Sequence, residues 1–239
     1  MTSRQLNIYR TRWHLLVTLG LLVLPFVFLL SFSELAHIGT ATLFKDLSIS
    51  FVRISVAYFI AAVLGWVWAV TFYKGKRGEM ALPIFDVLQS FPTFAALPLA
   101  VYIWGPTNFT VIFFLVLTII WPIFFSLVSS LKLVKSEWEE AVKIYGLSGK
   151  DYLKKFLWPV SVPALITGSV VGLGEGWEAL VATEIVAKTR IGLGSFFQSY
   201  SANFKITGFG ILGLLLLIFC INKIIWLPLL DWSHRTLEE

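Results

Sequence analysis

The stretch that decides the fold class is FTVIFFLVLTIIWPIFFSLVSSL, residues 109–131, which contains no charged side chain. The hydrocarbon core of a bilayer is about 30 Å thick, and a helix crosses it with about 20 apolar residues. This stretch is long enough and apolar enough to do so. We therefore expect residues 109–131 to form a transmembrane helix.

The composition of the whole chain extends this expectation to its other parts. Of 239 residues, 57% are hydrophobic and 14% are charged, whereas an ordinary soluble domain has about 25% charged residues. A soluble core of this size cannot bury so much apolar surface. Disordered chains are poor in aromatic residues, and 16% of this chain is Phe, Trp or Tyr, so disorder is excluded too. The single cysteine, Cys220, cannot form an internal disulfide.

Five further stretches meet the same length criterion, and the chain is therefore predicted to be an all-α membrane protein with six transmembrane helices. The predicted spans are residues 13–32, 49–73, 80–104, 109–131, 160–186 and 206–230. The first span follows basic residues, as the core of a secretory signal does, but it is longer than the roughly 7–15 apolar residues of such a core. We expect it to be retained, with residues 1–12 and 231–239 as tails on either side of one transmembrane domain, residues 13–230.

The distribution of Lys and Arg predicts the orientation of these spans. Thirteen of them lie on the side of the two termini and four, Lys45, Lys188, Arg190 and Lys205, lie on the opposite side. Cytoplasmic loops carry the excess of positive charge, so both termini are predicted to be cytoplasmic. Arg53 and Lys223 fall near span ends, where we expect their long side chains to reach the interface. The net charge of +5 then belongs to loops at a membrane and does not indicate nucleic acid.

The third span, residues 80–104, contains Pro83, Pro92 and Pro98. Each proline removes a helical hydrogen bond and clashes with the preceding turn, so this span is predicted to be kinked or broken. Broken helices at membrane depth line cavities or pack inside protein. Asp86 and Gln89 of this span are therefore candidates for a translocation pathway, although a bent and purely structural helix is the alternative.

The fifth span, residues 160–186, combines small and acidic residues. Gly168, Gly172 and Gly176 lie four residues apart on one stripe of the helix, which indicates close packing against another helix of the chain or of a second copy. Glu175 lies near this stripe and Glu178 about 60° from it. Carboxylates within a transmembrane helix normally face other protein segments or a water-filled cavity, and not lipid. The two glutamates are therefore either hydrogen-bonded to neighbouring helices or part of a transport pathway.

Glu184 of the same span is predicted on the face opposite the glycines. It is open to the same two interpretations as the other glutamates.

The longest polar stretch, residues 132–158, is predicted to be a cytoplasmic loop with a short amphipathic helix. Ser136 is placed to cap that helix, and Glu137, Glu139 and Glu140 would lie in its first turn. Gly146 and Gly149 then predict a break. The helix would expose apolar side chains on a surface suited to a protein partner. The residues expected on this surface are Glu140, Ala141, Ile144, Tyr145, Gly146, Leu147 and Lys150.

The same loop resembles the EAA loop of ABC importer permeases. Glu140-Ala141-Val142, three residues, Gly146, nine residues and Phe156-Leu157-Trp158-Pro159 resemble the pattern Glu-Ala-Ala, Gly and Ile-x-Leu-Pro without a gap. The Glu-Ala, the Gly and the Pro are in register, and Val142, Phe156 and Trp158 depart from the pattern. The resemblance implies a type I permease fold in which this loop is a coupling helix. It also implies ATPase subunits docked on residues 140–155, with ATP and Mg on those subunits and no cofactor on this chain.

Further motifs resemble the nitrate, sulfonate and taurine branch of these permeases. They are Leu88-Gln89-Ser90, Pro92 and Leu97-Pro98-Leu99 in the third span, and Trp177, Glu184 and Gly192-Leu193-Gly194 in and after the fifth. The resemblance implies a second permease chain, identical or related, and a substrate-binding protein at the outer loops around His37 and Gly192. It also implies a small anion as substrate, such as nitrate, a sulfonate or bicarbonate. Glu175 and Glu178 are not the side chains expected along a path for an anion.

The chain shows no phosphate-binding loop and no catalytic constellation. The segment 146–150 lacks the spacing of a nucleotide-binding motif, and the three histidines, His14, His37 and His234, lie near different membrane boundaries, which argues against a metal site. We therefore expect a transport subunit without enzymatic activity. The alternatives are a self-contained secondary transporter or channel that uses Glu175 and Glu178 as cation sites, and a membrane scaffold without transport activity.

Overall fold

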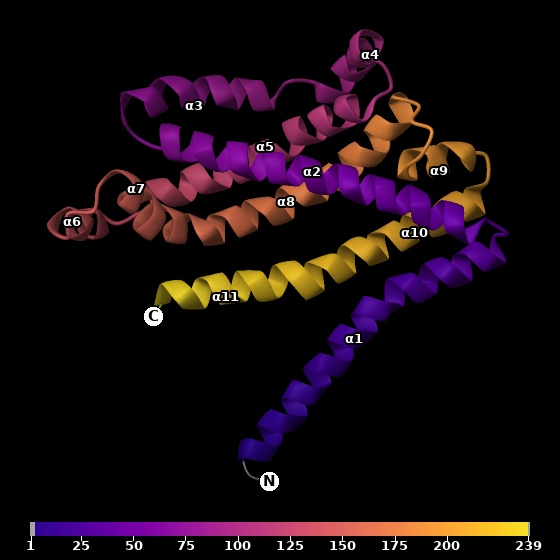
Figure 1. The fold of residues 1–239 in the computed structure, drawn as a ribbon, viewed down its shortest axis with the longest axis horizontal. Helices are drawn as coiled ribbons and strands as arrows, with labels where there is room; N and C mark the ends of the chain where they lie inside the picture. Colours follow the sequence, from indigo (N-terminus) through magenta and orange to yellow (C-terminus); the bar gives the residue numbers. More distant parts are fainter. Residues whose placement is uncertain (1–2, 239) are drawn as a thin grey trace.

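The computed structural model describes the backbone of residues 3–238 and the side chains of residues 18–233. All regular structure in this part of the chain is helical (Figure 1). Five helices are long and apolar enough to cross a membrane, and a bent pair of shorter helices makes a sixth crossing if it is counted as one span. The predicted all-α fold with six spans is confirmed in this sense. In the predicted tails the backbone of residues 3–12 and 231–238 is helical, whereas most of their side chains, and those of His14 and His234, lie outside the described part of the chain.

Three long helices form the centre of the molecule: α2 (Thr40–Phe72), α5 (Asn108–Lys132) and α8 (Trp158–Val186). The contacts of α5 with α8 and with α2 are the most extensive in the structure. Buried side chains of α5 fill the space between the three helices, chiefly Leu115, Ile119, Ile123, Phe124 and Leu127. Because this helix is covered on two sides, α5 is the central element of the bundle.

Small residues allow α2 to approach α5 closely. Ala57, Ala61, Gly65 and Ala69 recur every four residues on α2 and are all buried. A Cβ atom added to Gly65 would lie 3.1 Å from Cγ2 of Ile123 on α5. A stripe of small side chains at this spacing is typical of closely packed transmembrane helices.

The predicted break in the third span is confirmed. Helices α3 (Gly75–Gln89) and α4 (Thr93–Trp104) meet at an angle of 80°. Pro83 and Pro98 lie inside the two helices, and the chain turns between Gln89 and Thr93, next to Pro92. At Pro92 the backbone has a ψ of 74°, which is not helical. The proline therefore marks the point at which the helical hydrogen bonds are interrupted.

The remaining helices surround this centre. Helix α1 (Ser3–Leu35) packs on α10 (Phe204–Ile221) near its C-terminal end, and its N-terminal part diverges from the bundle (Figure 1). Helix α10 continues through a π-helical turn, η2 (Asn222–Trp226), into α11 (Leu227–Glu238). The short helix α9 (Leu193–Ser199) packs on α8 and α2 at one end of the molecule.

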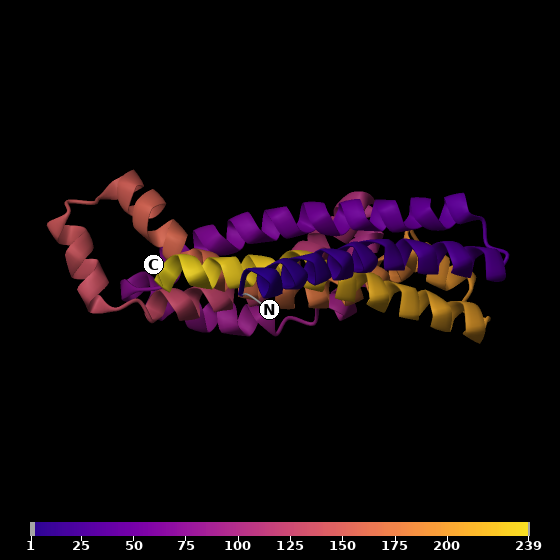
Figure 2. The same cartoon turned by 90° about the horizontal axis from the view of Figure 1, so that it is seen from below.

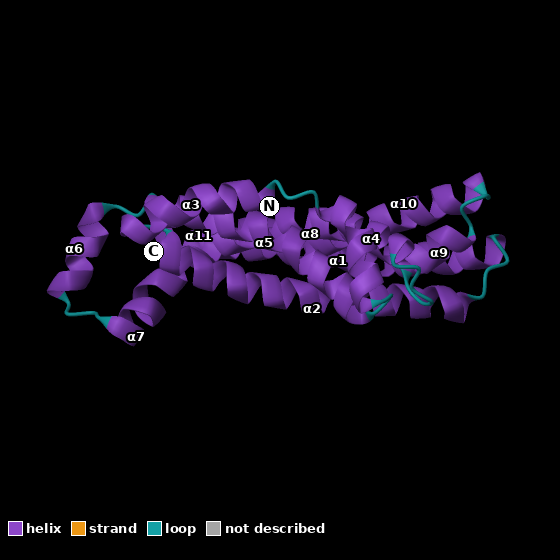
Figure 3. Cartoon of the chain, turned by 90° about the horizontal axis from the view of Figure 1, so that it is seen from above, coloured by secondary structure: helices purple, strands orange, loops and turns teal. Residues whose placement is uncertain are grey.

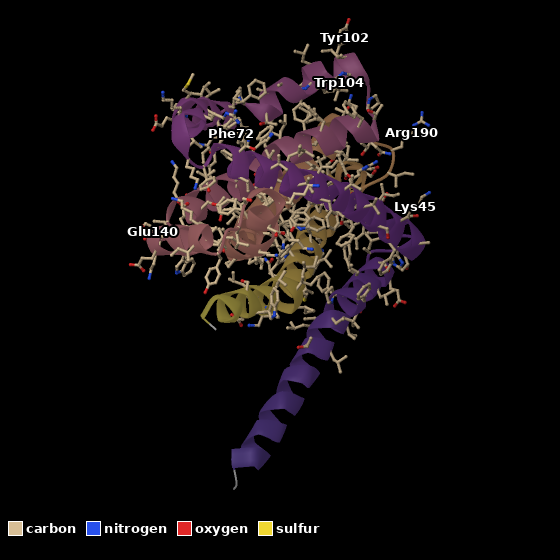
Figure 4. The ribbon with its side chains drawn as sticks, turned by 60° about the vertical axis from the view of Figure 1, so that its left-hand side comes forward. Lys45, Phe72, Tyr102, Trp104, Glu140 and Arg190 are labelled. Carbon is tan, nitrogen blue, oxygen red and sulfur yellow. The ribbon has the colours of Figure 1, made fainter. Side chains whose placement is uncertain are left out.

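The opposite end carries α6 (Ser136–Ile144) and α7 (Gly149–Tyr152), which project beyond the bundle (Figure 2). Figure 3 shows that short loops connect these two helices to each other and α6 to α5. Helix α7 runs without interruption through a π-helical turn, η1 (Leu153–Leu157), into α8. Lys45 and Arg190 lie at the end that holds α9, far from Glu140 of α6 (Figure 4). The two groups of loops inferred from the sequence therefore lie at opposite ends of the molecule.

Candidate functional site

The element formed by α6 and α7 is bounded by backbone features of its own sequence. Helix α6 ends at Ile144, and Gly146 adopts a φ of +67°, a left-handed conformation that glycine accepts without steric cost. Gly149, at the start of α7, has a φ of +53°. The predicted break at these two glycines is confirmed.

The predicted cap of α6 is wrong by one residue. Lys135 occupies the cap position and makes no side-chain hydrogen bond there, whereas Ser136 is already the first helical residue. The carbonyl of Lys135 accepts hydrogen bonds from the amides of Trp138 and Glu139, so the first turn closes one residue earlier than the sequence suggested. Glu137 and Glu139 do lie in the first turn, where a negative charge is favourable for the helix dipole.

Two contacts fix this element to the end of α2. Nζ of Lys74 lies 2.7 Å from Oε1 of Glu139, and the hydroxyls of Tyr73 and Tyr152 lie 3.3 Å apart. The Lys74 ammonium also lies 5.0 Å from the centre of the Tyr73 ring. Partial burial lowers the pKa of Lys74, but the hydrogen bonds to Glu139 and Tyr73 outweigh this and raise it above its ordinary value. Lys74 therefore stays charged at neutral pH.

The outer face of the element is apolar and open. Ile144 is 84% exposed and Tyr145 is 81% exposed. Glu140, Gly146 and Lys150 are exposed beside them, whereas Ala141 and Leu147 are half-buried. Large apolar side chains exposed outside the apolar spans leave a surface that a protein partner would cover.

A groove lies beside the break between α3 and α4. It has a volume of about 810 Å³ and is open on one side. The break contributes Gln89, Phe91, Pro92, Thr93, Phe94 and Ala95; α5 contributes Leu117, Thr118, Trp121, Pro122 and Phe125; and α8 contributes Val171 and Glu175. Its walls are therefore the broken helix and two of the three central helices, α5 and α8.

The structure separates the four polar residues predicted for a pathway. Gln89 and Glu175 line the groove. Asp86 lies one turn before Gln89 and accepts a hydrogen bond of 2.6 Å from its side-chain amide. Glu178 is exposed on α8 but is not among the residues that line the groove. The groove thus contains one of the two glutamates.

The three glycines of α8 pack against α5 of the same chain. A Cβ atom added to Gly168 would lie 2.7 Å from the Cα atom of Ile123, and one added to Gly172 would lie 2.9 Å from the carbonyl oxygen of Ile119. At Gly176 it would lie 2.9 Å from the Ile119 side chain. At Gly168 and Gly172 the contacts are with backbone atoms that cannot move aside, so only glycine fits there, whereas at Gly176 the Ile119 side chain would have to shift.

A buried polar cluster joins α2 to α8 at the end of the molecule that holds α9. Arg53 of α2 forms an ion pair with Glu184 of α8, and its other hydrogen bonds go to the side chain of Asn108 and the carbonyl of Ile191. Ser50 donates to the same carboxylate at 2.8 and 2.9 Å. Glu184 thus follows the first interpretation given for the glutamates, hydrogen bonding to a neighbouring helix, and it lies away from the glycine seam.

The expectation that Arg53 reaches the interface is wrong. Helix α2 begins at Thr40, nine residues before the predicted span, so Arg53 lies more than three turns into the helix. Buried at that depth, it pairs with Glu184. Lys223, for which the same was expected, has an exposed side chain.

The loop before α9 is built onto this cluster. The amides of Gly192, Leu193 and Gly194 donate to Asp46, Ser50 and Glu184, at 2.9, 2.8 and 2.8 Å. Gly192 has a φ of +141°, and a Cβ atom there would lie 2.5 Å from Oε2 of Glu184. The Gly-Leu-Gly sequence is therefore required by the close approach of its backbone to a carboxylate. The roles of Asp46, Ser50 and Asn108 could not be predicted from the sequence, because their partners are distant in the chain.

Comparison with known families decides the class of this molecule. The family model of the binding-protein-dependent transport system inner membrane component matches residues 61–231, which include the broken third span, the α6–α7 element and both central helices α5 and α8. The chain belongs to this family. Its motifs and its relatives are those of the nitrate, sulfonate and taurine branch of ABC importer permeases, as the sequence predicted.

Three relatives illustrate the branch. The chain is 30% identical to the nitrate import permease of Leptolyngbya laminosa over 73% of its length and 65% of the relative. It is 33% identical to the taurine transport system permease of Escherichia coli over 66% of its own length and 58% of that permease. It is 26% identical to the bicarbonate transport system permease of Synechococcus elongatus over 68% of its own length and 59% of that permease. The chain thus spans less than two thirds of the length of each of these permeases. The match does not favour the alternative of a secondary transporter.

Proposed function

We propose that the permease couples a translocation groove to a separate ATPase through α6 and α7. The observation that carries this proposal is the continuous helix from α7 through η1 to α8, which spans residues Gly149–Val186. One end of this helix belongs to the exposed element, and Glu175 in its other half lines the groove. A partner that moves α7 therefore acts on a helix that forms a wall of the groove.

The exposed face of the element is the proposed docking surface. Ile144 and Tyr145 are the anchors, and Glu140 and Lys150 are exposed polar groups around them. Apolar side chains surrounded by polar ones are typical of a protein interface. Lys74 and Glu139, together with Tyr73 and Tyr152, tie the base of the element to α2. The partner would thereby push on the bundle through both α2 and α8.

The open side of the groove supports a second permease chain, identical or related. One copy provides walls from α3, α4, α5 and α8 and leaves the groove open. A second copy facing it would enclose a pathway at the shared axis. A binding protein would deliver the solute at the end of the molecule that holds α9, where Lys45 and Arg190 lie. ATP and Mg would be held by the ATPase, and both termini would be cytoplasmic, which the excess of basic residues on their side supports.

Transport follows if ATP binds one conformation of the complex better than the other. An effector shifts a two-state equilibrium only by its difference in affinity for the two states. ATP that favours the outward-facing state would turn the groove outward, and hydrolysis would return it.

The test is co-purification of the tagged permease with its ATPase from native membranes, followed by ATP-dependent transport in proteoliposomes. Ile144→Asp and Tyr145→Asp are expected to abolish both the association and the transport. The matched control is Phe204→Asp, because Phe204 is 90% exposed at the end of the molecule far from α6. Transport that continues without any ATPase would overturn the proposal and favour a secondary carrier.

A further inference from the structure

The groove carries a negative charge and, among its described lining residues, no positive one. Glu175 is exposed into it, and the other polar side chains are the amide of Gln89 and the hydroxyls of Thr93 and Thr118. No Lys, Arg or His of the described chain lines it. An anion in this groove would approach a carboxylate without an opposite charge on the same chain.

Aromatic side chains form much of the remaining wall. Phe91 and Phe94 come from the break between α3 and α4, and Trp121 and Phe125 come from α5. Aromatic faces attract cations, most strongly when water is excluded, and Trp is the best of these side chains. The carboxylate and the aromatic rings therefore favour the same sign of charge.

The helix end at the break offers little to an anion. Amides at a helix N-terminus bind anions when they are free. At the start of α4, the amide of Thr93 donates to the carbonyl of Phe91 at 2.7 Å, and the amides of Ala95 and Ala96 donate to the carbonyl of Pro92 at 3.0 and 3.2 Å. Three of the first four amides of α4 are thus already paired within the chain.

Arg53, the one buried cation among the described residues, is also committed elsewhere. Arg53 of α2 is buried in the cluster at the end that holds α9, where it pairs with Glu184 and bonds to Asn108. Releasing it would leave Glu184 as an unpaired buried charge, which is strongly unfavourable. Arg53 is therefore not available to the groove.

We propose that the groove selects a solute with a protonated nitrogen, which lies at Glu175 while the apolar or aromatic part of the solute packs against Trp121 and Phe94. Such a solute is a small organic cation, or a zwitterion that presents its ammonium group to the groove. An inorganic anion such as nitrate or bicarbonate would meet no positive side chain among these lining residues. The inference rests on the proposed function, because it takes the groove as the pathway.

The charge preference of the groove is tested with thiol reagents of opposite charge, so that the solute itself need not be known. The assembled transporter, with its ATPase, is reconstituted with Cys220→Ala and either Thr118→Cys or Val171→Cys. Trimethylammonium-ethyl and sulfonato-ethyl methanethiosulfonate are then compared, with their rates on 2-mercaptoethanol as reference. A single carboxylate nearby is expected to raise the cation-to-anion rate ratio about tenfold above that reference.

Glu175→Gln is expected to return the ratio to the reference, whereas the matched control Glu178→Gln on the same helix leaves it raised. Two cysteine positions on different helices guard against a variant that does not fold. A ratio at or below the reference at both positions would overturn the inference. Labelling rates are also measured with ATP and vanadate. If the ratio is raised but the labelling rates do not respond to nucleotide, the charge preference holds and the groove is not the pathway. If the labelling rates respond to nucleotide but the ratio is not raised, the groove is the pathway and the charge preference is wrong.

Discussion

Arg53 of α2 and Glu184 of α8 form a buried ion pair between residues 131 positions apart in the sequence. The carboxylate also accepts hydrogen bonds from Ser50 and from the amide of Gly194. Glu184 is fully buried, and only a tenth of the Arg53 side chain is exposed. The pair therefore holds two transmembrane helices and the loop before α9 together at a single point.

Removing either partner is expected to destabilise the permease. Arg53→Met or Glu184→Gln leaves one buried charge without its partner, which typically costs about 3–5 kcal/mol. The double variant Arg53→Met/Glu184→Gln should lose less than the sum of the two single losses, because no unpaired charge remains. The measurement is thermal unfolding of the purified chain in detergent. Additive losses would show that the two side chains do not interact.

The glycine seam of α8 gives a prediction with a matched control on the same helix. Gly168→Ala places a methyl group 2.7 Å from the backbone of Ile123 and should cost about 1–3 kcal/mol through overpacking. Gly174→Ala meets nothing within 4 Å and should be neutral or stabilising by up to about 1 kcal/mol, because alanine is the better helix former. Unfolding midpoints of the two variants check this. Equal midpoints would mean that α8 and α5 are not closely packed at Gly168.

Substitution of Gly192 should disturb the loop before α9. In Gly192→Ala the added methyl group would lie 2.5 Å from the Glu184 carboxylate, on a backbone with a φ of +141°. Strained backbone of this kind costs on the order of 1–3 kcal/mol, and displacement of the carboxylate adds to it. Gly208→Ala on α10, where nothing lies within 4 Å, is the control. Limited proteolysis after residue 190 should cut the first variant and spare the second; resistance of both would contradict the contact.

The turn at Gly146 should be sensitive to substitution without affecting the bundle. A Cβ atom added to Gly146 would meet nothing within 4 Å, so Gly146→Ala causes no clash. Its φ of +67° is left-handed, however, and an alanine in this conformation costs about 1–2 kcal/mol. Hydrogen exchange should therefore rise about tenfold at the Leu147 amide, which bonds to the carbonyl of Val142 at 3.1 Å. Exchange within α5 should not change. Ser148→Ala is the control, and similar exchange in both variants would show that the turn is not strained.

The sequence predicted the features that depend on local pattern. Apolar length located the membrane helices, Pro92 located the break between α3 and α4, and Gly146 and Gly149 located the turn after α6. Each of these follows from the conformational limits of a single residue or from the length of one helix. The loop motif identified the family for the same reason, because its residues are contiguous.

Partners across the fold could not be predicted in this way. Arg53 was expected at the interface, because nothing near it in the sequence indicates Glu184. Glu175 and Glu178 lie three residues apart and are chemically identical, but only Glu175 lines the groove. Which of them does so depends on the rotation of α8 relative to α5, and that rotation is set by the contacts of its glycines. The sequence alone shows the stripe but not the helix that it packs against.

The continuous helix from Gly149 to Val186 connects the exposed α6–α7 element to the opposite end of the molecule. Its 38 residues span about 57 Å at the rise of an α-helix. The glycine seam holds the middle of this helix against α5, so a tilt of the helix would turn about the seam. A tilt of about 5° displaces one end relative to the other by about 5 Å at this length. Because the seam lies near the middle of the helix, a displacement of α7 would be passed in the opposite direction, without enlargement, to the end of the helix that leads to Gly192.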